Sequence, residues 1–474
     1  MDKGIKISGI RYIFEPKSVA VVGASEDKSK YGYFLMKNLM SLGFKGKIYP
    51  VNRKREKVLG LKCYPTVDSI SHNVETVIIM IPALHTLQVI KDCVKKGVKG
   101  VIICTSGFRE IGKKGIEIEN KIVEVAQKAG IRVIGPNTTG VLNAVNGFTS
   151  TFIIISRPNI GPVSIIAQTG MFASVLSDYI MTSQPFGLSK IVGLGNKSDV
   201  DDADVLEYLL HDQDTKVIAI YMEGVKDGRR LFNIAKKVTK KKPVLVLKSA
   251  YSKYGGDASL THTGSLMISD DIFEAVCKGS GMIRVDDIEE MFDYLKAFSF
   301  LPLLKKNRIA VIAYTGAGCV MSADACEKYG LKIAEFSTKT MNRLMKNAPS
   351  FGKIRNPIDA ELLRQGMGDM SSSLNFALET MLEDKNVDAV SMVLIGLSTA
   401  KELLDVDVEN IFSKIKKKYP KKPIVVTTIG GKEIVEDHKE RFERLAIPFY
   451  PSLLRNIRAL AALYNYGRII YGKS

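Results

Sequence analysis

The sequence has few of the features that mark membrane, secreted or metal-stabilised proteins. No run approaches the roughly 18 consecutive apolar residues that a membrane span needs, and the N-terminus has no signal-peptide core before a segment that we expect to be strand-like. The six cysteines are scattered without a CxxC pair, which indicates reduced thiols rather than disulfides or a zinc site. We therefore expect a cytoplasmic protein without a metal site.

Two nucleotide-binding signatures are also missing. No GxxxxGK[ST] motif occurs, and the first strand is followed only by Gly23 and Gly32, wider apart than in GxGxxG. Acidic residues are fewer than basic ones, 50 against 68, for a formal charge of +18. The lysines form short clusters where helices are expected to end, such as 236–237 and 416–418, and no basic stripe with interleaved aromatics follows. These patterns argue against a nucleic-acid partner and against a dehydrogenase.

What is present is a repeating α/β pattern. The 474 residues, 46% apolar and 25% charged, are enough for three domains of ordinary size. Short runs rich in Val and Ile alternate with amphipathic stretches, which is typical of parallel strands buried between helices. The expected strands are 18–22, 47–49, 76–81, 100–104 and 132–134, then 163–167, 190–193, 216–222 and 244–248, then 308–313, 332–335, 389–395, 424–429 and 448–450.

Two irregular stretches, 143–162 and 302–307, separate these sets of strands. We therefore predict domains at 1–145, 160–302 and 306–474. The second and third sets look like an internal repeat, since Gln168-Thr169-Gly170 and Tyr314-Thr315-Gly316 each follow a first strand and are expected to open a helix. Glu223 in one copy corresponds to Ile395 in the other, so chemistry is expected in the second domain.

The strand ends of the first domain predict a ligand site. In an open parallel sheet these ends meet at one edge, which is the usual ligand crevice. They bring together Gly23, Ala24, Ser25, Val51, Asn52, Ile81, Pro82, Ala83, Ser106, Gly107, Phe108 and Asn137, and three basic residues nearby, Lys28, Arg53 and Lys54, are candidates for phosphate contacts. The alternative is that these are turn residues only.

The strongest local signal for chemistry is a histidine in a loop of small residues, Thr261-His262-Thr263-Gly264-Ser265. Glu223, at a strand end, is placed to orient its imidazole, and Thr169-Gly170 is placed to hold a phosphoryl group. The arrangement predicts a phosphohistidine at His262, against the alternative of a structural histidine. Of the other four histidines, His438 is expected on a solvated helix face, and the remaining three at the surface or in packing contacts.

Several longer segments, in the same order along the chain, resemble the α subunit of the NDP-forming acyl-CoA synthetases, typified by ADP-forming acetate–CoA ligase and related to succinyl-CoA synthetase. Members of that family often have Ser at the position of Thr169, and the Thr side chain also carries a hydroxyl group. The matching segments are Pro16-Lys17-Ser18-Val19-Ala20-Val21-Val22-Gly23-Ala24-Ser25, Gly46-Lys47-Ile48-Tyr49-Pro50-Val51-Asn52, Ile134-Gly135-Pro136-Asn137, Leu194-Gly195-Asn196-Lys197-Ser198-Asp199-Val200-Asp201, Glu223-Gly224-Val225-Lys226-Asp227-Gly228-Arg229-Arg230 and His262-Thr263-Gly264-Ser265-Leu266.

The resemblance implies a Rossmann-like CoA-binding domain followed by two flavodoxin-like ligase domains. It implies an acid–thiol ligase that interconverts acyl-CoA, ADP and phosphate with a carboxylic acid, CoA and ATP, through an acyl phosphate and a phosphohistidine. His262 and Glu223 would be catalytic. Thr169, Gly170, Thr263 and Gly264 would bind phosphate, and the strand-end residues together with Lys54 would bind CoA.

The resemblance also implies a partner. No segment of the chain supplies an ATP-grasp domain, so ADP or ATP and Mg²⁺ are expected on a β subunit in an α2β2 heterotetramer. The competing interpretation is a non-catalytic protein that senses CoA or acyl-CoA.

Overall fold

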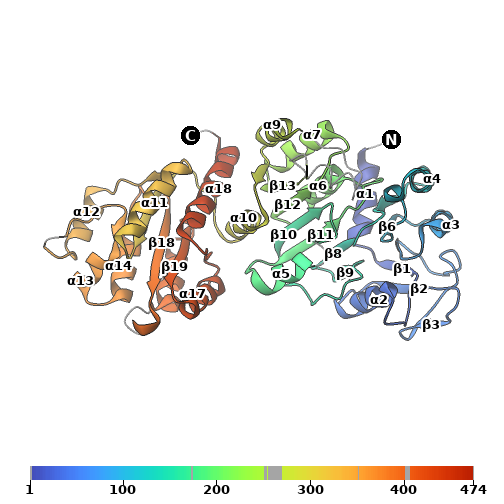
Figure 1. The fold of residues 1–474 in the computed structure, drawn as a ribbon, viewed down its shortest axis with the longest axis horizontal. Helices are drawn as coiled ribbons and strands as arrows, with labels where there is room; N and C mark the ends of the chain where they lie inside the picture. Colours follow the sequence, from blue (N-terminus) through green and yellow to red (C-terminus); the bar gives the residue numbers. More distant parts are fainter. Residues whose placement is uncertain are drawn as a thin grey trace. The chain divides into compact units, whose positions relative to one another are not determined.

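The Val- and Ile-rich runs form three mainly parallel sheets in the computed structural model, which describes residues 3–171, 175–249, 254, 269–350, 352–400 and 406–472. The predicted α/β class is therefore confirmed. The chain divides into two units, Met1–Met291 and Phe292–Ser474 (Figure 1). No helix among the described residues is both long and apolar enough to cross a membrane.

The first sheet of unit 1 has the order β2-β1-β5-β6-β7, with all neighbours parallel. Short β3 (Lys57–Val58) and β4 (Leu61–Lys62) pair separately. The sheet strands are β1 (Ser18–Val22), β2 (Lys47–Val51), β5 (Thr76–Ile79), β6 (Gly100–Ile103) and β7 (Arg132–Ile134), and the helices are α2 (Tyr31–Ser41), α3 (Ala83–Lys96), a short 3₁₀ turn η1 (Arg109–Ile111) and α4 (Lys113–Lys128).

The second sheet of unit 1 has the order β14-β13-β12-β10-β11-β8-β9. Its strands are β8 (Val141–Asn143), β9 (Phe148–Thr149), β10 (Ile160–Ala167), β11 (Leu188–Gly193), β12 (Val217–Met222), β13 (Val244–Lys248) and β14 (Ile283–Val285), and its helices are α5 (Val175–Ser183), α6 (Asp202–His211), α7 (Gly228–Val238), α9 (Asp270–Ser280) and α10 (Ile288–Phe300), which runs into unit 2. The β8–β9 hairpin pairs antiparallel with β11 and lies partly in the stretch predicted to be irregular.

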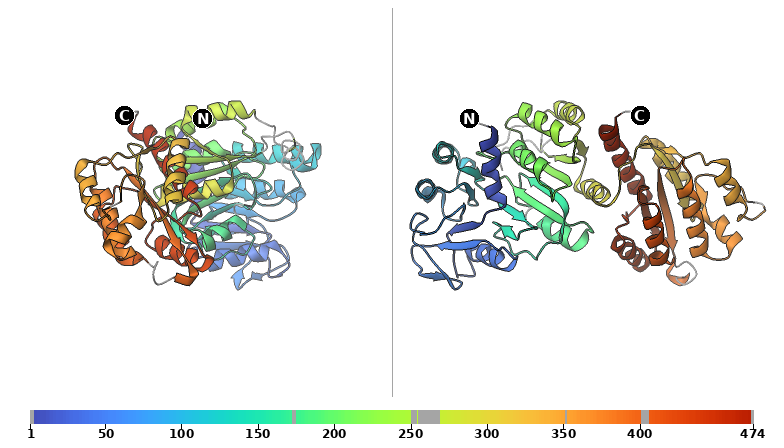
Figure 2. Two further views of the ribbon diagram at one scale, coloured as in Figure 1. Left: turned by 60° about the vertical axis from the view of Figure 1, so that its left-hand side comes forward. Right: turned by 180° about the vertical axis from the view of Figure 1, so that it is seen from behind.

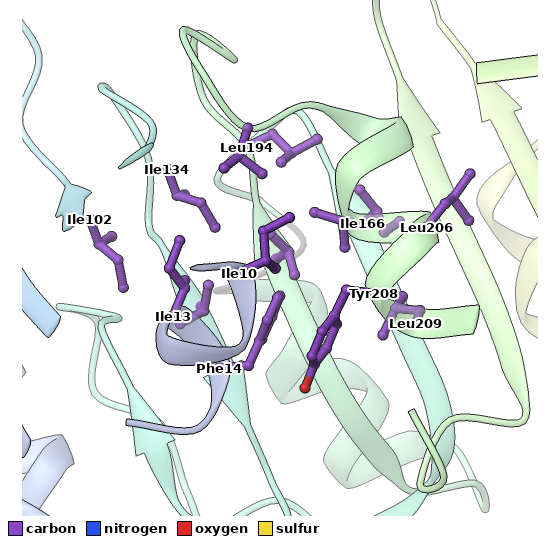
Figure 3. Packing of buried hydrophobic residues seen from close by; sticks show 14 of the residues in the cluster. Ile10, Ile13, Phe14, Ile102, Ile134, Ile166, Leu194, Leu206, Tyr208 and Leu209 are labelled. Atoms are coloured by element: carbon purple, nitrogen blue, oxygen red, sulfur yellow. The ribbon is translucent and has the colours of Figure 1, made fainter. Parts of the chain in front are cut away.

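The N-terminal segment is a helix, α1 (Lys3–Phe14), and not the predicted strand. Ile10, Ile13 and Phe14 are buried with the spacing of one helix face. Figure 3 shows these side chains among core residues of both sheets and of α6. The Phe14 ring stacks on Tyr208 of α6 with centroids 4.6 Å apart, so α1 joins the two sheets of unit 1 in one hydrophobic core.

Unit 2 holds the third sheet, ordered β16-β15-β18-β19, with β17 also pairing with β15. Side chains of α11 and α18 pack on one face of this sheet, and the side chains of the other helices form a second core on the opposite face. Figure 2 shows α18 lying along the sheet, seen from behind. The elements are β15 (Arg308–Ala313), α11 (Gly316–Lys328), β16 (Lys332–Ile333), α12 (Thr338–Met345), β17 (Ile358–Asp359), α13 (Ala360–Met367), α14 (Met370–Glu383), β18 (Ala389–Gly396), η2 (Ser398–Ala400), α16 (Val408–Lys418), β19 (Ile424–Gly430), α17 (Lys432–Arg444) and α18 (Leu453–Tyr471).

The strand order supports the internal repeat. In both the second and the third sheet the first long strand lies between the second and third strands of its set, as β11-β10-β12-β13 and β16-β15-β18-β19. Glu223 follows β12 directly, and Ile395 lies near the end of the equivalent β18. The boundaries of the three predicted domains stay a prediction.

Candidate functional site

The first candidate site lies at the carboxyl edge of the first sheet, where the chain crosses from one side of β1 to the other. This switch point is where open α/β sheets bind ligands. A cavity of about 470 Å³ opens here. Its lining residues are Val22, Gly23, Val51, Asn52, Arg53, Pro65, Thr66, Val67, Ile81, Pro82, His85, Gln88, Val89 and Asp92.

The turn after β1 is built around Gly23. Its φ of +93° is in the region that favours glycine, and a Cβ at this position would lie 2.8 Å from the Met80 carbonyl oxygen. The Asn52 side chain crosses to the same turn and donates to the Ala24 carbonyl at 2.9 Å. The ends of β1, β2 and β5 are thus held close together at the mouth of the cavity.

Five of the predicted CoA-binding residues line this cavity: Gly23, Val51, Asn52, Ile81 and Pro82. The structure does not place the others in its lining, and their roles stay predictions: Ala24, Ser25, Lys54, Ala83, Ser106, Gly107, Phe108 and Asn137. Sequence reasoning missed the contribution of α3, which supplies His85, Gln88, Val89 and Asp92. The polar residues at 85, 88 and 92 recur at helical spacing after a strand end, which was an available signal.

The loop after β6 is closed by Glu110. Its Oε1 accepts hydrogen bonds from the amides of Gly107, at 2.6 Å, and Phe108, at 3.2 Å, and its Oε2 accepts one from the Asn196 side chain at 3.0 Å. Burial alone would raise the pKa of Glu110, but these hydrogen bonds hold it below its usual value. Phe108 is fully buried, so it supports this loop from inside the core.

The second candidate site lies at the carboxyl ends of β10 and β12. Glu223 is only 8% exposed, and its Oε2 has no hydrogen-bond partner within the described part of the chain. The amides of Glu223 and Gly224 both donate to Gln168 Oε1 at 3.1 Å. Burial raises the pKa of the neighbouring Tyr221, and the Glu223 carboxylate contributes to the same shift.

Thr169 and Gly170 follow Gln168 in a turn, α5 is described from Val175, and residues 172–174 lie outside the described residues. That this turn opens the helix stays a prediction. The Met171 amide donates to Thr169 Oγ1 at 3.3 Å. A Cβ at Gly170 would lie 3.1 Å from Cγ2 of Thr139, so this glycine permits a close approach. Thr139 itself is buried, and its hydroxyl has no partner among the described residues.

The segment after β11 connects the loop after β6 with the Glu223 turn. Asn196 Nδ2 donates to Glu110 at 3.0 Å and to Glu119 at 3.1 Å, and Ser198 Oγ also bonds Glu119. Lys197 turns the other way, and its ammonium bonds the Gly224 carbonyl at 3.0 Å. Sequence reasoning did not give these residues a role.

A buried network of charged side chains lies next to the segment after β11. Arg132, at the start of β7, bonds Asp199 and Asp204, each at 2.9 Å. Arg230 from α7 bonds Asp204 as well. Burial would raise the pKa of Asp204, but the two arginines more than compensate and lower it.

Three predicted phosphate-site residues, His262, Thr263 and Gly264, lie outside the described residues. Further along the chain α9 begins at Asp270, with Ser269 before its first turn. His438 is not on a solvated face as predicted. It is 1% exposed, and its Nδ1 lies 2.9 Å from Thr428 Oγ1 of β19, because this face of α17 packs on the sheet.

Comparison with known proteins gives consistent matches over nearly the whole chain. The model of a CoA binding domain matches residues 17–144, and that of a succinyl-CoA ligase like flavodoxin domain matches residues 160–298. An ADP-forming acetate–CoA ligase II of Archaeoglobus fulgidus is 42% identical over 98% of this chain and 68% of its own length. An ADP-forming acetate–CoA ligase I subunit alpha of Pyrococcus furiosus is 38% identical over 96% of this chain and 97% of its own.

A solved structure agrees with these sequences. The dinucleotide-forming acetyl-coenzyme A synthetase 1 of Ca. Korarchaeum cryptofilum, in complex with phosphate and ADP, has a TM-score of 0.88 at 33% identity, covering 98% of this chain and 97% of that chain. These relatives are named as enzymes, which favours the catalytic interpretation over the CoA-sensing alternative.

Proposed function

The chain belongs to the ADP-forming acyl-CoA synthetases, a family of acid–thiol ligases, and on that premise we propose how its two sites divide the reaction. The sheet edge around Gly23 binds CoA, and the loop of His262 carries the phosphoryl group beside Glu223. The observation that carries the proposal is the buried Glu223 carboxylate at the end of β12, with an oxygen unpartnered among the described residues.

The first step exchanges a thioester for an acyl phosphate. A phosphate oxygen attacks the carbonyl carbon of acyl-CoA, the C–S bond breaks, and CoA leaves as a thiolate that takes up a proton. Thr169 and Gly170 hold the phosphate, and the CoA nucleotide lies in the cavity at the first sheet edge. Because Asn196 and Glu110 fix the two edges to each other, the thioester and the phosphate have a defined relative position.

The second step moves the phosphoryl group to the protein. A nitrogen of His262 attacks phosphorus, the bond from phosphorus to the acyl oxygen breaks, and the carboxylic acid leaves as its anion. Glu223 fixes the imidazole tautomer and stabilises the positive charge that develops on the ring. Thr263 and Gly264 contribute phosphate contacts. In the final step the phosphoryl group passes to ADP, and the reverse sequence makes acyl-CoA.

The nucleotide belongs to a partner of the ATP-grasp type, which would hold ADP or ATP with Mg²⁺ in an α2β2 assembly. Support comes from the name of the Pyrococcus furiosus relative, a subunit alpha that matches this chain over 97% of its own length. Native mass measurement after co-expression with such a partner is expected to give two copies of each chain. Full ATP-forming activity from this chain alone would refute the partner.

The deciding experiment looks for the phosphohistidine. The chain with its partner is incubated with an acyl-CoA and phosphate, kept alkaline, and digested for peptide mass spectrometry. We expect an acid-labile phosphate on His262, and loss of turnover with retained CoA binding in His262→Ala. His211→Ala, at the exposed end of α6, is the matched control and should keep turnover. No phosphate from any acyl-CoA, with CoA binding intact, would refute the relay.

A further inference from the structure

A buried ion pair lies directly behind the Glu223 turn. The Lys197 ammonium is 2.6 Å from Asp202 Oδ2, and each side chain is only 3% exposed. Lys197 has a φ of +52°, a conformation that is uncommon for a residue with a long side chain. With this backbone conformation the ammonium points into the protein, although leaving it in solvent would cost less free energy.

The ammonium also bonds the backbone beside Glu223. Lys197 Nζ donates to the Gly224 carbonyl at 3.0 Å, while the amides of Glu223 and Gly224 donate to Gln168 on the opposite side. This turn is therefore held at its N–H groups and at its carbonyl by two different side chains. Gln168 immediately precedes the phosphate turn at Thr169, so the same contacts fix the carboxylate relative to that turn.

We propose that Lys197 is a positioning residue for phosphoryl transfer: by fixing the Gly224 carbonyl, it sets the place of the Glu223 carboxylate relative to the phosphate turn. Gln168 completes the clamp from the other side. The inference rests on the proposed function, since it assigns Lys197 a part in the phosphohistidine step. Lys197 touches no reacting atom and acts only through the Glu223 turn.

The competing explanation is that the ion pair only stabilises the start of α6. The chain offers a matched control for this within β11. Lys190 is 2.8 Å from Asp212, with side chains 1% and 6% exposed. Its ammonium contacts Ser189, Asp212 and Asp214, none of them in the Glu223 turn. Each substitution pair removes one buried ammonium and one buried carboxylate, but only the Lys197–Asp202 pair contacts the Glu223 turn.

The test compares Lys197→Met/Asp202→Asn with Lys190→Met/Asp212→Asn in the full chain. Neither double variant leaves an unpaired buried carboxylate behind. The readout is single-turnover phosphorylation of His262 by acetyl phosphate, measured as maximum rate and half-saturating concentration. We expect the first variant to lower the maximum rate by about tenfold or more, the loss of a well-aligned geometry, with half-saturation and CoA affinity unchanged. The control should keep the wild-type rate, even if its melting temperature falls equally.

Equal rates in the two double variants, or rate losses that follow their melting temperatures, would overturn the proposal. If Lys197→Met/Asp202→Asn does not fold, Gln168→Met decides, because it removes the other half of the clamp without touching the ion pair. A normal maximum rate in Gln168→Met would then refute positioning. Failure of the proposed function itself looks different, because wild-type chain would then acquire no phosphate on His262.

Discussion

Replacing Glu223 with glutamine should separate the effect on catalysis from the effect on stability. The substitution keeps the shape of a side chain that is 8% exposed and removes its charge. One carboxylate oxygen has no partner among the described residues, and burying a charge has a cost in folding free energy. A group kept for structure alone would not be expected to carry this cost.

Glu223→Gln is expected to slow phosphorylation without lowering the free energy of unfolding. Loss of a carboxylate that orients and stabilises a charged imidazole should slow phosphorylation about 10²–10⁴-fold, which corresponds to about 3–5 kcal/mol in the activation barrier. An unsatisfied buried acceptor costs about 1–3 kcal/mol, and the new amide brings donors that offset part of the gain. The free energy of unfolding should therefore stay level or rise by about 1 kcal/mol, or about 2–4 °C in melting temperature.

Rapid-quench phosphorylation and calorimetry on the same preparation measure both properties. Glu223→Gln should phosphorylate slowly and melt at or above the wild-type temperature. A rate within about threefold of wild type, equivalent to less than about 1 kcal/mol, would refute the catalytic role. A fall in melting temperature of about 8 °C or more would show instead that the carboxylate is a structural element.

Three further predictions follow from the same structure. Gly23→Ala should weaken CoA binding by about tenfold or more in titration calorimetry, because its Cβ meets a backbone oxygen at 2.8 Å; Gly60→Ala, with a φ of +79° and open space around the Cβ, should not. The pKa of Asp204 is lowered in the folded protein, so its carboxylate should stabilise the fold above the unfolded pKa of about 3.9 and lose that contribution as the pH falls further. In acid unfolding, the stability of Asp204→Asn should therefore depend less steeply on pH in this range. An unchanged slope would contradict the assignment. Thr139→Val should raise the free energy of unfolding by about 1–2 kcal/mol in denaturant titration, because its buried hydroxyl has no partner among the described residues; a loss of stability would show that the hydroxyl is satisfied in solution.

Most of the parallel strands were predictable because burial on both faces leaves a continuous apolar run, as in Val217–Met222. The hairpin at Val141–Asn143 and Phe148–Thr149 was not predicted, because such short strands carry no period and owe their pairing to β11. His438 has charged neighbours in sequence and was therefore placed in solvent. Its burial is decided by the sheet beneath α17, which a local pattern does not contain.

The candidate site divides in the same way. Glu223 was identified because the two copies of the repeat differ there, and Gly23 because a strand-end glycine marks a tight turn. The proposed role of Lys197 could not be predicted, since no sequence pattern indicates a lysine with a positive φ and a buried ammonium. His85 was expected at the surface or in packing contacts. It is exposed, but its place in the cavity lining, on the first turn of α3, was not predicted.

The helix α1 has a consequence for exchanging parts between relatives. Its buried face packs on both sheets of unit 1, with the Phe14–Tyr208 stack and the hydrogen bond from Asn143 to the Phe14 carbonyl crossing between them. A chimera joined between the two sheets would place this helix against a surface that did not evolve with it. An exchange that keeps both sheets of unit 1 together leaves this core intact, so these two sheets should be exchanged as one piece.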